Sequence, residues 1–526
     1  MMKRIFAAAS LAAVCSTSAL AGGYLTNTNQ SIAFLRNPSQ DAMIGISALY
    51  NNPAGVTFLD KGFHFSLGLM NVNQQRNVTS SFAPFAYGVR NAGYDNKVGK
   101  LFKGEAIAPI VPSLQASYNF NDKWAVSFDF GIVGGGGKCE FAQGLGSFES
   151  QVALLPVLGS KVGIKAYDVE SYMRGRAYQF GFQLGAGYKI TDNLSLYGGV
   201  RVSYSTNNYF GYLRNISVAV DGATGMLNAN EYFTNLSSQA QFNAGQAALV
   251  AKQFAEAGAM EQAQEYAAIA EELKQSAITT GTLAVATQNV ELNCDQVAWG
   301  LTPVIGLDWK LNEHWNFAAK YEFKTKIRLK NESANSASAD NLAALNQFRD
   351  GNKVADDVPA ILTLGAQYSP ISSVRINAGY HYYWDKQATR YGEANKLLSG
   401  GTFEVTAGAE WDITKALTVS AGWQLTNYPN TDPVMRDISF ATNSNSFGIG
   451  VKYQINKTIG VEAGYFQTFY QQYDKVSADY NGTSSIAGLA AGPEAAGALV
   501  ASGALTGTDH FKRENRVIGL GVTLDF

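Results

Sequence analysis

The residues that most often carry chemistry are few in this chain and lie far apart. Its four histidines are His64, His314, His381 and His510, and no two of them are four residues apart. Because a metal site on a helix places two ligands at about that spacing, the histidines do not indicate a metal centre. The chain also lacks the Gly-x-Ser-x-Gly turn that exposes a nucleophilic serine in many hydrolases.

The glycine run before Lys138 superficially resembles a phosphate-binding loop. In the pattern Gly-x-x-x-x-Gly-Lys-Ser/Thr, the first glycine falls on Ile132 and the hydroxyl position falls on Cys139. Both required residues are therefore absent, and the run does not predict nucleotide binding. We expect no cofactor and no enzymatic activity, although a hydrolase assembled from distant strands is kept as a third hypothesis.

Charged residues instead occur singly among small and polar residues. In short segments, every second residue is apolar and the residues between are small or polar. The single charges Arg201, Glu322, Glu410, Lys452 and Glu462 lie among these small or polar residues. A period of two with one apolar face indicates a β-strand. The core of a soluble β-sandwich would not bury these charges, so we expect them to face the lumen of a barrel.

The last eleven residues show this alternation without interruption. One face carries Ile518, Leu520, Val522, Leu524 and Phe526, and the other carries small or polar residues. Comparable segments are about ten residues long and have aromatic residues at their ends, which is typical of strands that cross the outer membrane. The alternation therefore predicts an all-β transmembrane barrel.

Composition agrees with one large β structure. Charged residues make up 16% of the 526 residues, against about 25% in average soluble proteins. Glycine accounts for 53 residues, or about 10%, against about 7%. The net charge of −2 gives no basic surface for nucleic acid. A mean hydropathy of −0.09 is too low for a helical membrane protein.

We predict fourteen antiparallel strands joined by short turns at one end and long loops at the other. The long loops are expected around residues 72–108, 134–170, 208–296, 330–357, 386–401, 427–444 and 473–514. The strand centres are expected near Leu67, Leu114, Phe128, Phe182, Val200, Ile305, Phe317, Leu364, Ile376, Ala407, Val419, Ile449, Ala463 and Leu520. Short turns on one side and long loops on the other, with an even strand number, characterise bacterial outer-membrane barrels.

The first residues predict export. Lys3 and Arg4 precede a short apolar stretch and an Ala-x-Ala site, so residues 1–21 are interpreted as a signal peptide cut after Ala21. Cys15 leaves a lipoprotein as the minor alternative. We expect the mature chain in the outer membrane of a Gram-negative bacterium, inserted by the barrel assembly machinery as a monomer and in contact with membrane lipid and lipopolysaccharide.

The sequence also gives predictions for two of the long loops and for two cysteines. The stretch 245–276 predicts a helix in the long loop 208–296, which either caps the pore or lies free in solvent, and capping is favoured. The apolar stretch 486–505 suits a lid or a patch for apolar molecules, with no special role as the equal alternative. Cys139 and Cys294 are the cysteines of the mature chain, and pairing between them stays open.

The segment before the first strand resembles the FadL family of outer-membrane long-chain fatty acid and hydrocarbon transporters. The resemblance rests on Gly23 and Tyr24 after the cleavage site, a small-residue stretch from Asp41 to Ala48, and the tripeptide Asn52, Pro53 and Ala54. It implies that residues 22–60 form a hatch inside a barrel of residues 61–526. It also implies passive uptake of hydrophobic compounds, above all long-chain fatty acids, which bind at the outer loops.

In such proteins the ligand moves to a pocket beside the extreme N-terminus, here Tyr24 and Leu25, and leaves sideways where the third strand bends inward. That bend corresponds to the glycines at the end of the third predicted strand, Gly131, Gly134, Gly135, Gly136 and Gly137. Lumen-facing Arg201 and Lys320 are candidate partners for a carboxylate, with a purely structural network as the favoured alternative. The competing function is a non-specific porin or a structural outer-membrane protein.

Overall fold

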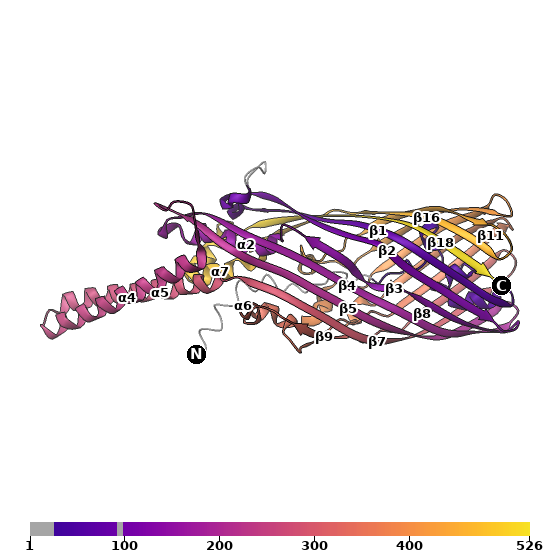
Figure 1. Ribbon diagram of the computed structural model, residues 1–526, viewed down its shortest axis with the longest axis horizontal. Helices are drawn as coiled ribbons and strands as arrows, with labels where there is room; N and C mark the ends of the chain where they lie inside the picture. Colours follow the sequence, from indigo (N-terminus) through magenta and orange to yellow (C-terminus); the bar gives the residue numbers. More distant parts are fainter. Residues whose placement is uncertain (1–25, 92–97) are drawn as a thin grey trace.

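The computed structural model describes residues 26–91 and 98–526 (Figure 1). The predicted signal peptide, together with Tyr24 and Leu25, lies outside the described residues. Eighteen strands form one sheet, and fourteen of them build a closed antiparallel barrel. The ring closes where β1 pairs with β18, for example Leu69 with Leu520. All fourteen strand centres expected from the sequence fall within these strands.

The fourteen wall strands follow one another around the barrel in chain order. They are β1 (Gly62–Phe82), β2 (Gly99–Asn119), β3 (Trp124–Phe141), β4 (Ile164–Thr191), β5 (Leu194–Val220), β7 (Val290–Lys310), β8 (Trp315–Glu322), β11 (Ile361–Ile371), β12 (Val374–Tyr383), β13 (Phe403–Asp412), β14 (Leu417–Asn427), β15 (Ser444–Gln454), β16 (Ile459–Tyr470) and β18 (Gly507–Asp525). Four short strands pair beyond the wall at the loop end: β6 (Met226–Asn228), β9 (Arg328–Ser333), β10 (Lys353–Ala355) and β17 (Tyr473–Ser477).

The outside of the wall is apolar. Leu184, Trp299 and Leu520 are 65%, 64% and 66% exposed, and their neighbours on the same face are also apolar. So large an exposed apolar surface would be unfavourable in water, whereas lipid acyl chains can cover it. At the end with short turns, the rings of Trp124 and Tyr188 pack 4.6 Å apart, as expected where the wall meets the membrane interface. The outside surface therefore confirms a transmembrane barrel.

One side of the barrel is much taller than the other. β1 to β5 and β7 have 18 to 28 residues, whereas about ten tilted residues suffice to cross a membrane. The predicted loops 72–108, 134–170 and 208–296 are therefore too wide, because much of each is a continuation of the flanking strands. The sequence signal was lost there because, above the membrane, the outer face becomes polar and the alternation of apolar and polar residues disappears.

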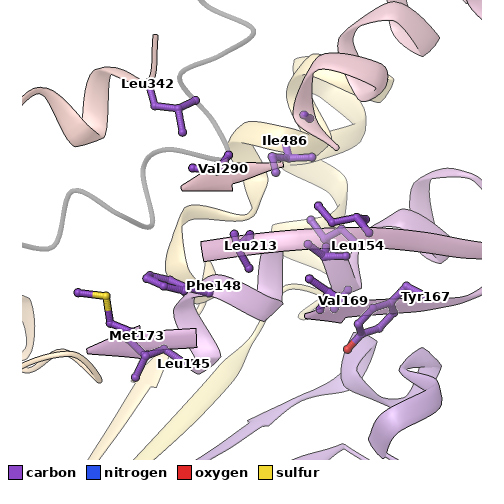
Figure 2. Packing of buried hydrophobic residues seen from close by; sticks show 14 of the residues in the cluster. Leu145, Phe148, Leu154, Tyr167, Val169, Met173, Leu213, Val290, Leu342 and Ile486 are labelled. Atoms are coloured by element: carbon purple, nitrogen blue, oxygen red, sulfur yellow. The ribbon is translucent and has the colours of Figure 1, made fainter. Parts of the chain in front are cut away.

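A hydrophobic cluster closes the tall end of the barrel (Figure 2). It joins strand ends to the helices α2 (Gly146–Ala153), α3 (Leu155–Leu158), α6 (Ala337–Asp340), α7 (Ser484–Ala491) and α8 (Pro493–Ala501). Phe148 and Ile486 contribute side chains from α2 and α7. The apolar stretch 486–505 thus packs into this cluster through α7 and α8. Short 3-10 helices complete the loops: η5 (Ala83–Tyr87), η6 (Val89–Asn91), η7 (Ser160–Val162), η8 (Ala343–Phe348), η9 (Asp385–Gln387), η10 (Tyr391–Leu397), η11 (Asp432–Val434) and η12 (Tyr480–Gly482).

The long loop between β5 and β7 contains two helices rather than one. α4 (Ala229–Glu256) and α5 (Met260–Ala286) form an antiparallel hairpin whose seam is small, with Ala263, Ala270 and Ala277 repeating every seven residues on α5. Each helix is roughly 40 Å long, and the hairpin points away from the barrel (Figure 1). The stretch 245–276 therefore does not cap the pore, whereas the base of the hairpin, with Phe233 and Leu283, packs into the hydrophobic cluster at the tall end. Within the described chain, no helix combines the length and the apolar character needed to cross a membrane.

The segment from Thr26 to Asp60 runs inside the barrel. It contains α1 (Ile32–Arg36), η3 (Ile46–Ala48) and η4 (Pro53–Phe58), and nearly all of its side chains are buried. Ser31 caps α1 by accepting a hydrogen bond from the Phe34 amide. Phe34 and Leu35 pack against Phe466 and Val517 of the wall. The segment is thus a packed part of the lumen with its own apolar contacts.

Candidate functional site

The Asn52-Pro53-Ala54 tripeptide fixes the end of the N-terminal segment to the wall. The Asn52 side chain accepts a hydrogen bond from the Gly55 amide at 3.2 Å and so caps η4, while its amide nitrogen donates to Asp308 of β7. Pro53 occupies the first helical position, where its missing N–H costs nothing. Ala54 is fully buried against Tyr197 and Val304. Each residue of the tripeptide thus has a distinct role in docking the segment.

Arg36 of α1 binds polar side chains of the wall beside the helix, on β13, β14 and β16. Its guanidinium lies 3.6 Å from Glu410 and 3.7 Å from Glu462, and it donates to the Ser420 hydroxyl at 2.5 Å. All of these side chains are buried. The positive charge of the segment is therefore compensated by carboxylates of the barrel, which holds α1 in one position.

A second polar contact ties the middle of the segment to β12 and β13. His381 contacts Asp41 through Nε2 at 2.9 Å and Glu404 through Nδ1 at 2.7 Å, and the Tyr383 hydroxyl donates to Glu404 at 2.7 Å. Among the described residues, no cluster of three His, Cys, Asp or Glu side chains is arranged to hold a metal ion. This group of residues is best understood as an attachment of the segment to the wall.

The two basic residues named from the sequence as candidate partners for a carboxylate already have partners. Arg201 and Lys320 lie 2.5 and 2.7 Å from the Glu322 carboxylate, and their cations lie 4.8 and 4.2 Å from the ring centre of Tyr50. Lys320 also donates to the Tyr50 carbonyl at 2.6 Å. We call these four residues the Glu322 cluster. Its geometry favours the structural alternative, in which both cations hold the N-terminal segment.

The wall is open between β2 and β3. These strands pair from Asn119 opposite Ala125 up to Leu114 opposite Phe130, and pairing resumes only at Glu105 opposite Glu140. Between these points, residues 106–113 of β2 and 131–139 of β3 have no partner across the seam, over roughly 25 Å of strand. We call this stretch the wall gap. All five glycines proposed as a lateral gate lie on its β3 side.

The local sequence explains why pairing fails there. β2 carries Pro109 and Pro112 inside the gap, and proline has no N–H to donate to a neighbouring strand. On β3, Gly135 and Gly137 have positive φ angles of 92° and 71°, which only glycine adopts without strain. The pairing of β3 with β4 also shifts register on both sides of Gly134. The two prolines are a sequence signal for the gap that our strand analysis missed.

The N-terminal segment takes over the hydrogen bonds that β3 loses. The Asn27 amide donates to the Val133 carbonyl at 3.0 Å, and the side chains of Asn27 and Gln30 both donate to the Ile132 carbonyl, at 2.9 and 2.8 Å. Thr26 forms an isolated bridge with Gly134. Because this segment lies in the lumen, β3 is held inward at the gap.

A cavity of ≈ 220 Å³ lies directly behind the gap. Both edges of the gap line it, with Ala108 and Val111 from β2 and Ile132, Gly135 and Gly137 from β3. The remaining lining residues come from the N-terminal segment, from β1 and β4 on either side of the gap, and from β16 and β18: Thr26, Asn27, Asn29, Met70, Val72, Gln74, Arg76, Tyr178, Tyr470, Arg513, Asn515 and Val517. We call this cavity the lumenal pocket. A molecule in it faces the gap on one side and the start of the described N-terminal segment on the other.

Two arginines face each other in the lumenal pocket. Arg76 of β1 and Arg513 of β18 are paired in register, and only 1% and 5% of their surface is exposed. Arg76 donates to Gln74 at 2.7 Å, and Arg513 lies over the Tyr470 ring at 4.7 Å. None of the described lining residues is acidic. Nε and Nη1 of Arg513 have no hydrogen-bond partner among the described residues, so these buried donors are suited to an anionic group.

Sequence reasoning missed both arginines because Arg76 and Arg513 fell in stretches read as loops. Their strands extend further than the apolar alternation does, so neither residue was assigned a face. Two arginines facing each other on β1 and β18 could have indicated an anion-binding site. Recognising this requires the register between these two strands, which the sequence alone does not give.

A second, apolar cleft lies at the tall end of the barrel. It is lined by Phe148, Met173, Gly211, Tyr212, Leu213, Val290, Leu292, Leu345, Phe348 and Ile438. Figure 2 shows Phe148, Met173 and Leu213 close together from α2, β4 and β5. Its enclosed volume is only ≈ 20 Å³, so its walls are in near contact and an apolar guest would have to separate them.

The two cysteines are not bonded to each other. Both thiols are buried and free. Cys139 pairs with Gly175, Gly175 with Tyr209, and Tyr209 with Cys294 on successive strands. Three strand spacings separate the two cysteines by about 14 Å, twice the largest Cα separation that a disulfide spans.

No protein-family model and no curated protein matches this sequence. Solved structures do match its fold. A FadL homologue from Pseudomonas aeruginosa is 12% identical, with a TM-score of 0.58 over 96% of this chain and 100% of that one. The toluene transporter TodX from P. putida is 15% identical, with a TM-score of 0.50 over 92% of this chain and 94% of that one. The fold is thus that of FadL-type outer-membrane barrels.

Proposed function

We propose that this protein is a passive outer-membrane transporter that takes up hydrophobic compounds with an anionic head group, most simply long-chain fatty acids. The ligand enters at the apolar cleft of the tall end, moves to the lumenal pocket and leaves sideways through the wall gap into the membrane. The proposal is supported by the FadL-type fold and by solved neighbours whose names describe FadL and toluene transport. The wall gap between β2 and β3 allows lateral exit into the membrane, which a fully paired barrel wall would not allow.

The observation that carries the proposal is the pair formed by Arg76 and Arg513. Like charges directly opposite each other on neighbouring strands are destabilising, and Nε and Nη1 of Arg513 are buried without a hydrogen-bond partner among the described residues, which is costly. A carboxylate binds guanidinium groups through paired, charge-assisted hydrogen bonds. We infer that the head group of the ligand binds between these arginines while its chain lies against Met70, Val72 and Val111.

The apolar part of the ligand supplies the remaining affinity. Each methylene group removed from water contributes about 0.8 kcal/mol, so a long alkyl chain favours an apolar cleft and pocket without added energy. No nucleotide-binding motif occurs in the sequence. Transport therefore follows the concentration gradient.

The N-terminal segment acts, in this proposal, as a hatch formed by residues 22–60. Its described part occupies much of the lumen and is attached to the wall at Arg36, Asp41 and Asn52. A general porin needs an open aqueous channel, so this filling argues against the porin alternative. The expected conductance of the intact protein in a planar bilayer is low, and removal of residues 22–50 should raise it.

The proposal is tested by ligand binding to purified protein in detergent. The probes are oleate, methyl oleate and toluene, added to the wild type and to an Arg76→Gln/Arg513→Gln variant. Loss of two charge-assisted contacts should weaken oleate binding by about a hundredfold, at roughly 1.5 kcal/mol for each contact. Methyl oleate, which lacks the carboxylate, should bind both proteins equally.

The matched control is Arg174→Gln/Arg176→Gln, which removes the same charge from the outer surface and should leave oleate binding unchanged. If the pocket variant binds oleate as tightly as the wild type, the carboxylate assignment is wrong. If toluene binds tightly and oleate does not, the protein is a hydrocarbon channel. A large steady conductance of the intact protein would favour a porin instead.

A further inference from the structure

A group of basic residues faces outward on β3 and β4, beside the upper end of the wall gap. Lys138 pairs in register with Arg176, and Glu140 pairs with Arg174. Side chains alternate between the two faces of a strand, so Lys138, Arg174 and Arg176 share the outer face with the exposed apolar residues Phe182 and Leu184. We call these three cations the outer basic group.

The outer basic group lies at the level of lipid head groups. On β4, Arg176 is twelve positions before Tyr188, which marks the membrane interface at the short-turn end. Twelve residues of a strand tilted by about 40° rise roughly 30 Å, and the apolar band of such barrels is about 25 Å tall. Tyr204 and Trp299, whose rings pack 4.7 Å apart, mark the upper edge of this band on the neighbouring strands.

The positive charge of this group is only partly compensated. Lys138 forms an ion pair with Glu140 at 2.9 Å. Arg174 donates to the amide oxygen of Asn208 at 2.9 Å and lies 5.6 Å from the Phe210 ring centre. In residues 26–91 and 98–526, no carboxylate forms a salt bridge with either Arg174 or Arg176. Glu140 and Glu105 of β2, which pairs with Glu140 in register, therefore stand against three cations, and the group keeps an excess of one positive charge.

Some other outward cations of the rim are paired. On β18, Lys512 and Arg516 lie 3.1 and 3.9 Å from Glu514. Higher up, Arg214 of β5 lies 3.0 Å from Glu170. The positive charge on β3 and β4 is therefore less compensated than the charge at these two places on the rim.

We propose that the outer basic group binds a phosphate of lipid A, the membrane anchor of lipopolysaccharide, in the outer leaflet. Arginine presents a planar set of donors that fits phosphate oxygens, and basic groups at the membrane surface recognise anionic lipid head groups. The exposed apolar strand surface below the group offers contacts for the acyl chains. This inference does not depend on the transport proposal, because all of its residues face the outside of the barrel.

The position of Lys138 gives the bound lipid a defined neighbour. Lys138 lies within residues 131–139, the β3 side of the wall gap. A lipid A molecule held by Lys138 and Arg176 would lie directly beside the upper part of the wall gap. The lipid next to the gap at this height would then be lipid A.

The test measures binding of lipid A to the full-length purified barrel by native mass spectrometry. The probes are bisphosphorylated lipid A, a dephosphorylated lipid A, phosphatidylglycerol and inorganic phosphate. Arg174→Gln/Arg176→Gln should lower the apparent affinity for bisphosphorylated lipid A by about tenfold or more. The control Lys252→Gln/Lys274→Gln removes the same charge from the exposed helical hairpin and should have no effect.

A conservative Arg174→Lys/Arg176→Lys variant, which retains the charge, should recover most of the affinity, and heat-modifiability on gels shows that each variant is folded. Unchanged lipid A binding by the Gln variant would overturn the proposal. Equal binding of dephosphorylated lipid A would also overturn it, because phosphate would then not be recognised. If phosphatidylglycerol or inorganic phosphate binds equally and shows the same loss, the group is a general anion site and the assignment to lipid A is wrong.

Discussion

Two groups of buried cations line the lumen, and they differ in what compensates them. In the Glu322 cluster, Arg201 and Lys320 share one carboxylate and stack on Tyr50 of the N-terminal segment. In the lumenal pocket, Arg76 and Arg513 face each other with no acidic residue among the described lining. Breaking a buried ion pair leaves an uncompensated charge and is costly, whereas Arg513 already has two buried donor atoms without a hydrogen-bond partner among the described residues. The comparison teaches that burial of a charge alone does not identify a ligand site, and that buried donors left without a partner, as on Arg513, are the better guide.

The largest effect is expected from removing the counter-charge of the Glu322 cluster. Glu322→Gln leaves Arg201 and Lys320 buried without a carboxylate, and the free energy of unfolding should fall by about 3–5 kcal/mol. Denaturant titration of the barrel in phospholipid vesicles measures the change. Glu332→Gln, which breaks the exposed pair with Lys330, serves as control and should cost less than about 0.5 kcal/mol. Equal losses would show that the Glu322 cluster is not a compensated unit.

The next effect concerns the bent wall beside the lumenal pocket. A Cβ on Gly135 would lie 2.4 Å from the Ala177 carbonyl oxygen, and its φ of 92° is strained for any other residue. Gly135→Ala should therefore shift β3 at the gap, destabilise the fold by about 2 kcal/mol and reduce uptake of labelled oleate by cells.

Gly137→Ala provides the matched comparison. Its φ of 71° imposes backbone strain, but nothing lies within 4 Å of the added Cβ. It should cost only about 1 kcal/mol and leave uptake largely intact. Equal uptake by the two variants, with both displayed at the cell surface, would show that the gap does not depend on the bend at Gly135.

A smaller effect of opposite sign is expected in the lumenal pocket. Removing the facing charges with Arg76→Gln/Arg513→Gln should leave the free energy of unfolding unchanged or raise it by about 1 kcal/mol, because like-charge repulsion disappears. The same vesicle titration measures it beside Arg174→Gln/Arg176→Gln. A loss of several kcal/mol would mean that this pair is structural, like the Glu322 cluster, and would remove the contrast between them.

The smallest effect is a pH dependence at the tall end, where an anion is buried instead of a cation. Asp437 lies in the loop between β14 and β15, and burial raises its pKa, while hydrogen bonds from the Ser147 amide and hydroxyl oppose that rise. A carboxyl whose pKa is raised on folding contributes stability that is complete below its ordinary pKa of about 4 and is lost as pH rises through the folded-state value.

Limited proteolysis of the outer loops should therefore become faster as pH increases above about 4, with an effect on the order of 1 kcal/mol or less. Asp437→Asn, which cannot titrate, should flatten this dependence, whereas Asp432→Asn in the same loop should not. A dependence of the opposite sign would show that the charged form of Asp437 is the one that the fold stabilises.

Much of the fold could be predicted from the sequence because membrane strands carry their own signal. The alternation from Arg516 to Phe526, and similar stretches elsewhere, located all fourteen wall strands. The tripeptide Asn52-Pro53-Ala54 indicated the N-terminal segment, and its capping and docking contacts now give it a physical role. Pattern alone failed where the strands leave the membrane, since water no longer requires an apolar outer face.

The candidate site was less predictable for the same reason. Arg76, Arg513 and the outer basic group all belong to strand extensions that were read as loops. The favoured capping by 245–276 failed because a run of helical residues indicates a helix but not its direction. The hairpin packs on itself through its alanines over most of its length, and its base, with Phe233 and Leu283, joins the hydrophobic cluster at the tall end.

The sequence by itself determined the membrane-facing surface of this protein, because lipid contact acts on each strand separately and leaves a period of two in the residues. Glycines and prolines likewise marked where a strand would bend or lack a donor. Only the tertiary structure decided which charges meet. Arg201 and Lys320 gained Glu322 and Tyr50, while Arg76 and Arg513 gained each other, because neighbours across a closed barrel are set by strand register and not by distance along the chain. Electrostatic energy depends on those distances in space, so the difference between a structural charge and a ligand-binding charge exists only in the folded molecule.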